Sequence, residues 1–372
     1  MVDPDTHVVR HCYVHVPFCP QICPFCSFHV LRRAPGIVEA YLDRLDAELV
    51  ESADRVDVAL DTTYLGGGTP SMLRTAELER LLDSIDRHLG GIGSEVTLEI
   101  HPGTATASRL AEWRGLGITR FSIGVESTDD DVLATLGRRH GAAPALELVE
   151  QALALDGAVV SVDLMVAVPG QDLEAELARI VALGTQHVST YTLTIEAGTP
   201  FERDGVVVDP DDEAEAFGRS TEVLAAAGLR RYEVSNHARP GHECGHNLGY
   251  WRSDWWLGVG PSAAGHEPGS DDVAAVRRVN PHLAAWLDGV PPELEARDAA
   301  GFALDAVVAG LRIRDGIDLA GLGARVGVDL VGRWHHVIGD LVADGRLERD
   351  GTSIRATDAG VRVLDQVTAA FV

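Results

Sequence analysis

Three of the five cysteines in this 372-residue chain lie close enough together to hold one metal centre. Cys19, Cys23 and Cys26 form a CxxxCxxC pattern. Thiolates are the protein ligands of [4Fe–4S] clusters, and three of them would leave the fourth iron open to bind a small molecule. Structural zinc is one alternative, but it needs four ligands, so His15 or His29 would have to join the cysteines. Another alternative is a group of buried thiols that bind nothing.

A run of three glycines is the second feature that could form part of a binding site. Gly66, Gly67 and Gly68 precede Thr69 directly after a predicted strand. Glycine lets backbone N–H and C=O groups approach a ligand closely, because it has no Cβ. The alternative is a tight turn between a strand and a helix, so the triplet alone is a weak signal.

The elements that must position these residues alternate between short strand-like runs and amphipathic helical patterns. The predicted strands are Cys12–Val16, Val58–Leu65, Val96–Ile100, Arg120–Val125, Val159–Val166 and Val188–Leu193. The predicted helices include Ala107–Gly115, Pro144–Leu155, Leu173–Leu183 and Glu213–Ala227. Repeated strand–helix units favour a parallel sheet with right-handed crossovers. We therefore predict an α/β fold with a partial TIM-type barrel of about six βα units. An open doubly wound sheet is the alternative.

Polar residues recur near the carboxyl ends of these predicted strands. The cysteines follow the first strand and the glycines follow the second, while Glu99, Glu126 and Asp163 belong to the next three. Each acid alone is explained by a surface charge or a helix cap. Because the carboxyl ends of barrel strands converge on one mouth, we expect these acids to share a site with the cysteines.

The C-terminal part has a different pattern, and Pro291 and Pro292 mark its boundary. Its predicted helices are Phe302–Leu311, Leu319–Val326 and Asp329–Asp344. An Asp350-Gly351 pair between two short runs indicates a hairpin, so this part resembles a small winged helix. The predicted division is a partial barrel at 1–195, a barrel extension at 196–290 and a winged-helix-like C-terminal domain at 291–372.

The charge balance limits the partners. The chain has 31 basic and 57 acidic residues, for a net charge of −26. Such a surface repels phosphate backbones and anionic lipids, so we expect no nucleic-acid partner. Every basic residue is arginine, and the absence of lysine excludes Schiff-base and Walker A lysine chemistry.

No apolar stretch is long enough to span a membrane, so no integral membrane segment is expected. The residues from Met1 to Asp5 include acids and a proline in place of the basic and apolar regions of a signal peptide. Together with the clustered cysteines, this favours a cytoplasmic protein.

Several motifs resemble the radical S-adenosylmethionine superfamily. Val14-His15-Val16-Pro17-Phe18 runs into the cysteine motif, and Gly66-Gly67-Gly68-Thr69-Pro70 follows. More narrowly, the chain resembles the branch that contains the oxygen-independent coproporphyrinogen III oxidases and the HemW heme chaperones. Tyr232-Glu233-Val234-Ser235-Asn236 and an HNxxYW run from His246 to Trp251 continue the resemblance. The oxidases carry a further cysteine where Phe28 stands, and HNxxYW is typical of the chaperones, so the resemblance favours the chaperones.

The resemblance implies a role for each candidate site residue. Cys19, Cys23 and Cys26 would ligate the [4Fe–4S] cluster, and S-adenosylmethionine would chelate its open iron. The residues that the resemblance places around S-adenosylmethionine are Tyr13, Phe25, Gly67, Gly68, Thr69, Glu99, Glu126, Arg138 and Asp163. Arg138 would face the methionine carboxylate. Glu126 stands where the family usually has glutamine, and its carboxylate would still accept from ribose hydroxyls.

The same resemblance implies a heme site at His246, Asn247, Tyr250 and Trp251, with His246 nominated as the axial ligand. A hydrogen-bonded loop histidine is the alternative for His246. The implied function is a heme chaperone that delivers heme to acceptor hemoproteins, without coproporphyrinogen oxidase activity, and we expect a homodimer.

Two other functions stay open on the sequence. One is a radical S-adenosylmethionine enzyme of the coproporphyrinogen oxidase type or of the HemN-like methyltransferase type. The other is a zinc-stabilised interaction module without redox chemistry. Phe28 and HNxxYW favour the heme chaperone over both.

Overall fold

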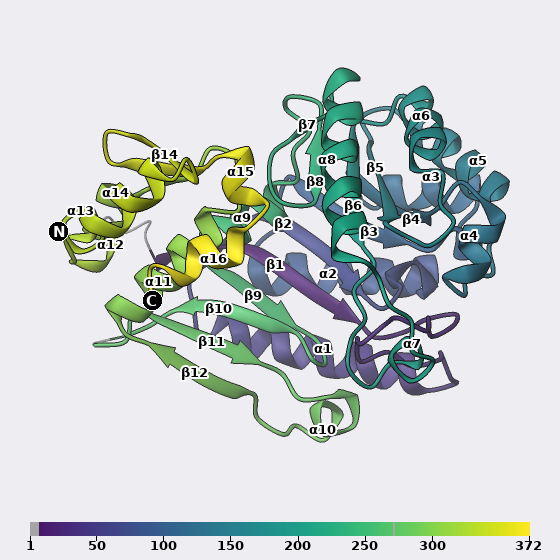
Figure 1. Ribbon diagram of the computed structural model, residues 1–372. Helices are drawn as coiled ribbons and strands as arrows, with labels where there is room; N and C mark the ends of the chain where they lie inside the picture. The colour runs from purple at the N-terminus through teal and green to yellow at the C-terminus, as the bar shows by residue number, and fades with distance from the viewer. Residues whose placement is uncertain (1–6, 271) are drawn as a thin grey trace.

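The computed structural model describes residues 7–270 and 272–372. Met1 to Asp5, on which the signal-peptide expectation rested, lie outside the described residues. The centre of the fold is a twelve-stranded sheet with the order β12-β11-β10-β9-β1-β2-β3-β4-β5-β6-β8-β7 (Figure 1). The strand order begins at β12 and ends at β7, so the described sheet is open.

Six consecutive parallel strands form the middle of this sheet. They are β1 (Val9–Val16), β2 (Val58–Gly67), β3 (Glu95–Ile100), β4 (Arg120–Glu126), β5 (Val159–Val166) and β6 (His187–Thr192). The crossover helices are α1 (Ile37–Ala53), α2 (Thr75–Leu89), α3 (Ala107–Gly115), α4 (Asp130–Thr135), α5 (Ala142–Leu153) and α6 (Leu173–Leu183). Short 3-10 helices lie at Pro70–Met72 and Pro102–Thr104. The predicted α/β fold with a parallel sheet is confirmed.

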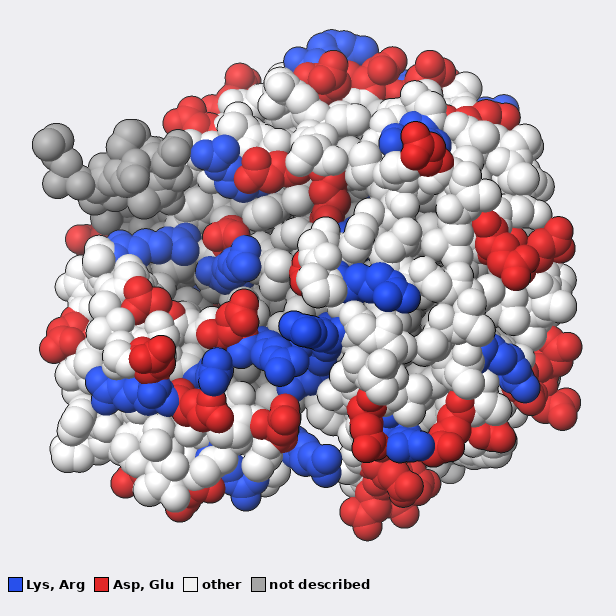
Figure 2. Space-filling view, turned by 90° about the horizontal axis from the view of Figure 1, so that it is seen from above, with Lys and Arg blue, Asp and Glu red and all other residues white. Residues whose placement is uncertain are grey.

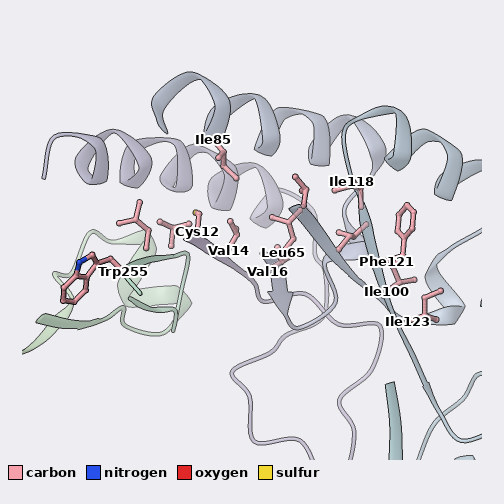
Figure 3. Packing of buried hydrophobic residues seen from close by; sticks show 14 of the residues in the cluster. Cys12, Val14, Val16, Leu65, Ile85, Ile100, Ile118, Phe121, Ile123 and Trp255 are labelled. Atoms are coloured by element: carbon pink, nitrogen blue, oxygen red, sulfur yellow. The ribbon is translucent and has the colours of Figure 1, made fainter. Parts of the chain in front are cut away.

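Side chains alternate between the two faces of each strand, so one face of the sheet packs in the hydrophobic core and the other face is available for a site. Cys12 and Val14 of β1 and Leu65 of β2 are fully buried against the helical layer. Figure 3 shows these side chains beneath the helices, with Ile85 of α2 pointing toward them. Because successive strand residues point to opposite faces, the residues between them face the other side of the sheet. That second face carries the polar groups described below.

Later parts of the chain extend both edges of the sheet (Figure 1). Beyond β6 come α7 (Pro200–Arg203), α8 (Pro210–Ala226), β7 (Arg230–Arg231) and β8 (Asn236–Ala238). On the other edge, β9 (Trp256–Val259) pairs with β1, and β10 (Ala264–Pro268), β11 (Ala275–Val279) and β12 (Glu293–Arg297) follow outward in that order. In the chain, α9 (Gly245–Trp251) precedes these strands and α10 (Leu283–Leu287) follows β11. The predicted division at 195 and 290 stays a prediction.

The C-terminal part contains helices and a small sheet, as expected. Its elements are α11 (Ala299–Gly310), β13 (Ile317–Asp318), α12 (Leu319–Val326), α13 (Leu330–Arg333), α14 (His335–Ala343), β14 (Leu347–Asp350), β15 (Ser353–Ala356), α15 (Asp358–Val361) and α16 (Leu364–Ala369). The predicted single helix Asp329–Asp344 was wrong, because the chain breaks at Trp334. The indole of Trp334 is buried and donates a 3.2 Å hydrogen bond to the carbonyl of Phe371, which holds it at the break. Among the described residues, no helix has both the length and the apolarity needed to cross a membrane.

Candidate functional site

A cavity of about 410 Å³ lies at the carboxyl ends of the parallel strands. It brings together eleven of the residues proposed for the cluster and S-adenosylmethionine, namely Cys19, Cys23, Phe25, Cys26, Gly67, Gly68, Thr69, Glu99, Glu126, Arg138 and Asp163. Tyr13 lies outside this lining, and its hydroxyl is 3.2 Å from Nδ1 of His15. The cysteine loop and the acids of β3, β4 and β5 therefore share one cavity.

Backbone hydrogen bonds shape the loop that carries the cysteines. The amide of Cys19 donates to the carbonyl of Leu31 at 2.9 Å, and that of Cys26 donates to the carbonyl of Cys23 at 3.1 Å. Sγ of Cys19 also lies 3.4 Å from Oγ1 of Thr69, which follows the glycine triplet. Burial raises the pKa of Cys19 to about 11, so this thiol holds its proton at neutral pH when no metal is bound.

The chemistry of the three thiols in this cavity matches the donor set of an iron–sulfur cluster. Across the described ranges, no three histidine, cysteine or acidic side chains converge on one point as ligands of a single ion would. Each thiolate of a [4Fe–4S] cluster binds a different iron, so its ligands need not converge. Cys12 and Cys244 are buried and do not line this cavity.

The glycine triplet is required by close packing against β1. Gly67 has a φ of +99°, and a Cβ there would lie 2.4 Å from Nδ1 of His15. A Cβ on Gly68 would lie 2.7 Å from the carbonyl oxygen of Val16. The amide of Gly67 donates to Glu99 at 3.1 Å, so the glycine backbone forms part of the cavity wall beside this carboxylate.

Two buried carboxyl groups in the cavity hold protons more tightly than usual. Burial raises the pKa of Glu99 to about 7, although the hydroxyl of Tyr64 donates to it at 2.9 Å. Burial likewise raises the pKa of Asp163 to about 6, against a 2.9 Å hydrogen bond from Ser122. The negative charges of Asp163 and Glu126 also raise the pKa of Glu99, and the charge of Glu126 raises the pKa of Asp163. The cavity therefore has two groups that exchange protons near neutral pH.

Arg138 forms an ion pair with Glu126 on the cavity wall. Glu126 has a φ of +65° at an irregularity in the β4–β5 pairing, which turns its backbone out of the regular strand. The guanidinium carbon of Arg138 lies 5.6 Å from the ring centroid of Phe25. Its buried Nε has no partner among the described residues, so Arg138 retains a donor that a bound anion would satisfy.

The HNxxYW residues lie on α9 and do not line this cavity, but the ring of His246 stacks on that of Tyr64, which does, with 5.1 Å between the ring centroids. Oγ1 of Thr62 lies 2.7 Å from Nδ1 of His246, and the hydroxyl of Tyr250 lies 2.8 Å from its Nε2. Glu95 accepts hydrogen bonds from the amides of Gly245 and His246 at 3.1 and 3.0 Å. Because Glu95 is the first residue of β3 and Glu99 lies near its end, α9 lies toward the opposite end of the strands from the cysteines.

His246 is fully buried, and both of its ring nitrogens are hydrogen-bonded in this structure. Asn247 and Trp251 are partly exposed, and the guanidinium carbon of Arg312 lies 5.6 Å from the ring centroid of Trp251. Thus the four residues proposed for heme are close together in sequence, but His246 has no nitrogen free to ligate iron as it stands.

The sequence prediction omitted several residues that line the cavity, including Tyr64 and Ser122. Tyr64 contacts Glu99, and Ser122 contacts Asp163. A period of two along the strands was the signal that would have found them. Tyr64 precedes Leu65 and Ser122 precedes Ile123, and both Leu65 and Ile123 lie in the hydrophobic core, so Tyr64 and Ser122 point to the other face of the sheet.

Comparisons with known proteins identify the family of this chain. The sequence model of the Radical SAM superfamily matches residues 13–182, and that of the HemN C-terminal domain matches residues 300–363. The heme chaperone HemW of Mycobacterium tuberculosis is 35% identical over 370 residues, which cover 95% of this chain and 93% of the relative. The heme chaperone HemW of Escherichia coli is 37% identical over 264 residues, which cover 68% of this chain and 69% of the relative.

A solved structure also shares the fold. Coproporphyrinogen III oxidase (HemN) from Escherichia coli, described as a radical SAM enzyme, superimposes with a TM-score of 0.81 at 20% identity. The match covers 98% of this chain and 90% of that chain. At this level of identity the likeness shows a common fold and does not transfer the oxidase activity.

Proposed function

Because the chain belongs to the HemW family of the radical SAM superfamily, we propose that it is a heme chaperone. In this proposal it binds heme, a [4Fe–4S] cluster and S-adenosylmethionine, and it delivers heme to acceptor hemoproteins. One observation carries the proposal. The similarity to a protein named as a heme chaperone covers 95% of this chain, and so extends well beyond the superfamily's shared core.

The cysteine loop would hold the cluster. When bound, a [4Fe–4S] cluster held by three thiolates would supply an open iron to which S-adenosylmethionine could bind. Cys19, Cys23 and Cys26 provide three thiolates from one loop. Burial raises the pKa values of Cys19 and Cys23, so these two thiols must release protons when metal binds. Thr69 provides a hydroxyl beside Sγ of Cys19.

The rest of the cavity supports the binding of S-adenosylmethionine. The unpaired Nε of Arg138 offers a donor to the methionine carboxylate, and Glu126 keeps this guanidinium in place. Phe25 presents an aromatic ring beside Arg138. Glu99, with a pKa of about 7, is held by Tyr64 and the amide of Gly67, where it can accept from a ligand's amino group.

The role of His246 as axial heme ligand stays a prediction. Iron ligation would require it to give up its hydrogen bond with Thr62 or the one with Tyr250. Heme binding at HNxxYW would therefore be accompanied by a change in α9. We expect His246→Ala to shift the Soret band of bound heme, whereas Thr62→Val should leave ligation intact because it removes only a hydrogen-bond partner.

The deciding experiment measures heme binding and enzymatic turnover on the same preparation. The anaerobically reconstituted protein is titrated with heme, and the Soret band is followed. In parallel, the protein is incubated with coproporphyrinogen III, S-adenosylmethionine and a reductant, and vinyl products are measured. A heme complex without vinyl product supports the chaperone. Absence of heme binding, with vinyl product formed, would replace it with the radical-enzyme alternative.

The proposal extends to location and assembly. A cytoplasmic protein fits the cysteine loop, because thiols are kept reduced in that compartment. The net charge of −26 disfavours nucleic acid as a partner. The expected homodimer is tested by sedimentation velocity over a range of protein concentrations.

A further inference from the structure

Three buried polar side chains connect β5 with the segment that leads into α9. They are Ser161 of β5, His187, which is the first residue of β6, and Tyr232. None of the three lines the cysteine cavity, whereas Asp163, two residues after Ser161 on the same face of β5, does. Because the three side chains are buried, they are a separate set from the charged side chains that Figure 2 shows on the surface.

The strand register brings these side chains into a continuous series of hydrogen bonds. Ser161 is the sheet partner of His187, and its Oγ lies 2.7 Å from Nδ1 of that residue. Nε2 of His187 lies 2.9 Å from the hydroxyl of Tyr232, which accepts from the amide of Cys244 at 3.3 Å. At the other end, the hydroxyl of Ser161 donates to Asp163 at 3.5 Å, the longest contact of the series. Since Cys244 is the N-cap residue of α9, these groups form a relay from the cavity to the start of that helix.

The number of available protons determines the direction of the relay. An ionised carboxylate only accepts hydrogen bonds, so the single hydroxyl proton of Ser161 points to Asp163. The oxygen of Ser161 must then accept from an N–H group at Nδ1 of His187. A neutral imidazole has only one N–H group, so Nε2 of His187 accepts from the hydroxyl of Tyr232. His187 is therefore the Nδ1–H tautomer when Asp163 is ionised.

The surroundings of His187 keep its ring neutral. Burial lowers the pKa of His187 well below 6.5, and the charges of Arg120 and His237 lower it further. Arg120 is itself held by Glu95, with 3.2 Å between Nη2 and the carboxylate. The imidazole of His187 can therefore respond to its neighbours only by moving its proton from one ring nitrogen to the other.

Asp163 is the member of the relay whose charge changes near pH 6. Burial raises its pKa to about 6, and the hydrogen bond from Ser189 opposes this rise. The other titratable groups that act on Asp163, or on which it acts, come from four strands or their ends and are Tyr64, Glu99, Glu126 and Tyr191. The proton state of this one carboxyl group therefore sets the direction of every hydrogen bond behind it.

We propose that His187 is a positioning residue that couples Asp163 in the cysteine cavity to the start of α9. When Asp163 takes up a proton from solvent, the hydroxyl of Ser161 is free to donate to Nδ1 of His187. The imidazole proton then resides on Nε2 and is donated to Tyr232. The hydroxyl proton of Tyr232 has now lost its acceptor, so the contact between Tyr232 and the amide of Cys244 weakens. The net change is one proton gained at Asp163 and one imidazole proton moved from Nδ1 to Nε2.

The coupling is reciprocal, because a change at either end of the relay alters the free energy of the other end. The helix α9 also contacts the cavity wall directly, since the ring of His246 stacks on that of Tyr64, and Tyr64 donates to Glu99 at 2.9 Å. The coupling itself rests on the relay. Its further meaning, a link between S-adenosylmethionine at Asp163 and heme at α9, rests on the proposed function.

Two isotope labels follow the two ends of the relay in the anaerobically reconstituted, heme-free protein. Ring signals of ¹⁵N-labelled histidine report the tautomer of His187, and His187→Gln identifies them. Amide signals of ¹⁵N-labelled cysteine report the hydrogen exchange of Cys244, and Cys244→Ser identifies that signal. Spectra are recorded from about pH 7.5 to about pH 5, on either side of the pKa of Asp163.

Two serine variants separate the relay from a general effect of Asp163. Ser161→Ala breaks the relay. Ser122→Ala is the matched control, because Ser122 donates to Asp163 at 2.9 Å without belonging to the relay. The amide of Cys12, in the sheet core, is the internal reference that corrects for a change in overall stability.

We expect the wild type and Ser122→Ala to change from the Nδ1–H to the Nε2–H tautomer of His187 as the pH falls. The protection factor of the Cys244 amide should fall about fivefold relative to that of Cys12, as expected for one weakened hydrogen bond. Ser161→Ala should show neither change. A constant tautomer or a constant relative protection factor in the wild type, or the same response in Ser161→Ala, overturns the proposal. Because no heme is present, none of these results depends on the chaperone function.

Discussion

At the scale of single residues, the five cysteines divide into two groups by their surroundings. Cys19, Cys23 and Cys26 line the cavity, whereas Cys12 lies in the sheet core and Cys244 contacts Glu95. We expect Cys→Ser at any of the first three to reduce iron and sulfide content to near background after anaerobic reconstitution. Cys12→Ser and Cys244→Ser are the controls and should keep wild-type iron. Normal iron content in any variant of the first group would contradict the ligand assignment.

A second residue-scale prediction concerns Gly67. A side chain there must adopt an unfavourable φ of +99° and approach His15 within 2.4 Å, so Gly67→Ala should lower the free energy of unfolding by about 2–3 kcal/mol. The matched control is Gly184→Ala, because Gly184 has a φ of +77° and nothing within 4 Å of its Cβ position. It should cost about 1 kcal/mol in urea denaturation. Equal losses in the two variants would show that the contact with His15 is readily relieved.

At the scale of elements, α9 depends on a carboxylate from a distant strand. Glu95 accepts from the amides of Gly245 and His246 and lies 3.2 Å from the buried Arg120. We expect Glu95→Gln to lower the free energy of unfolding by about 2 kcal/mol, because the hydrogen bonds to a charged acceptor weaken and Arg120 loses its counter-ion. Hydrogen exchange should accelerate at the amides of Gly245 and His246. Substitution of the exposed Glu150 should change neither quantity, and unchanged exchange in Glu95→Gln would mean that other contacts hold α9.

At the scale of the whole molecule, buried histidines determine the response to acid. Burial lowers the pKa of His237 and of His266 from 6.5 to about 4, and it lowers the pKa of His187 and His246 further. The unfolded chain takes up these protons near pH 6.5, but the folded chain does not. Their contribution to stability is therefore complete above pH 6.5 and is lost as the pH falls toward 4.

Glu99 and Asp163 act in the opposite direction, because their pKa values are raised to about 7 and 6. They stabilise the folded chain at low pH and lose that contribution as the pH rises. Among the described residues, eight histidines have lowered pKa values and four acids, these two together with Glu48 and Glu233, have raised ones. We therefore expect the free energy of unfolding to fall between pH 6.5 and 4. Each histidine contributes up to about 1.4 kcal/mol per pH unit. Urea denaturation across this range is the measurement, and His266→Gln should reduce the slope. A stability that rises on acidification would contradict the prediction.

The sequence by itself determined the features that depend on neighbouring residues. The order of strands and helices, the glycine-rich turn and the Asp350-Gly351 hairpin all follow from periodicity and turn chemistry over a few positions. The cysteine loop and the acids at the strand ends could also be assigned to one site from the sequence, because the carboxyl ends of parallel strands lie at one edge of the sheet.

Only the tertiary structure decided which distant side chains meet. His246 is hydrogen-bonded to Thr62, which lies 184 positions earlier in the chain. This hydrogen bond occupies one of the two ring nitrogens that could ligate heme iron. The pairing of Arg138 with Glu126 and the break at Trp334 likewise depend on contacts that no local pattern encodes. The position of Arg231 also depends on packing, because it is buried where β7 lies against α8 and the C-terminal part, and two of its nitrogens have no partner among the described residues. Local patterns report the preference of each segment, whereas the partner of a buried polar group is set by how the segments pack.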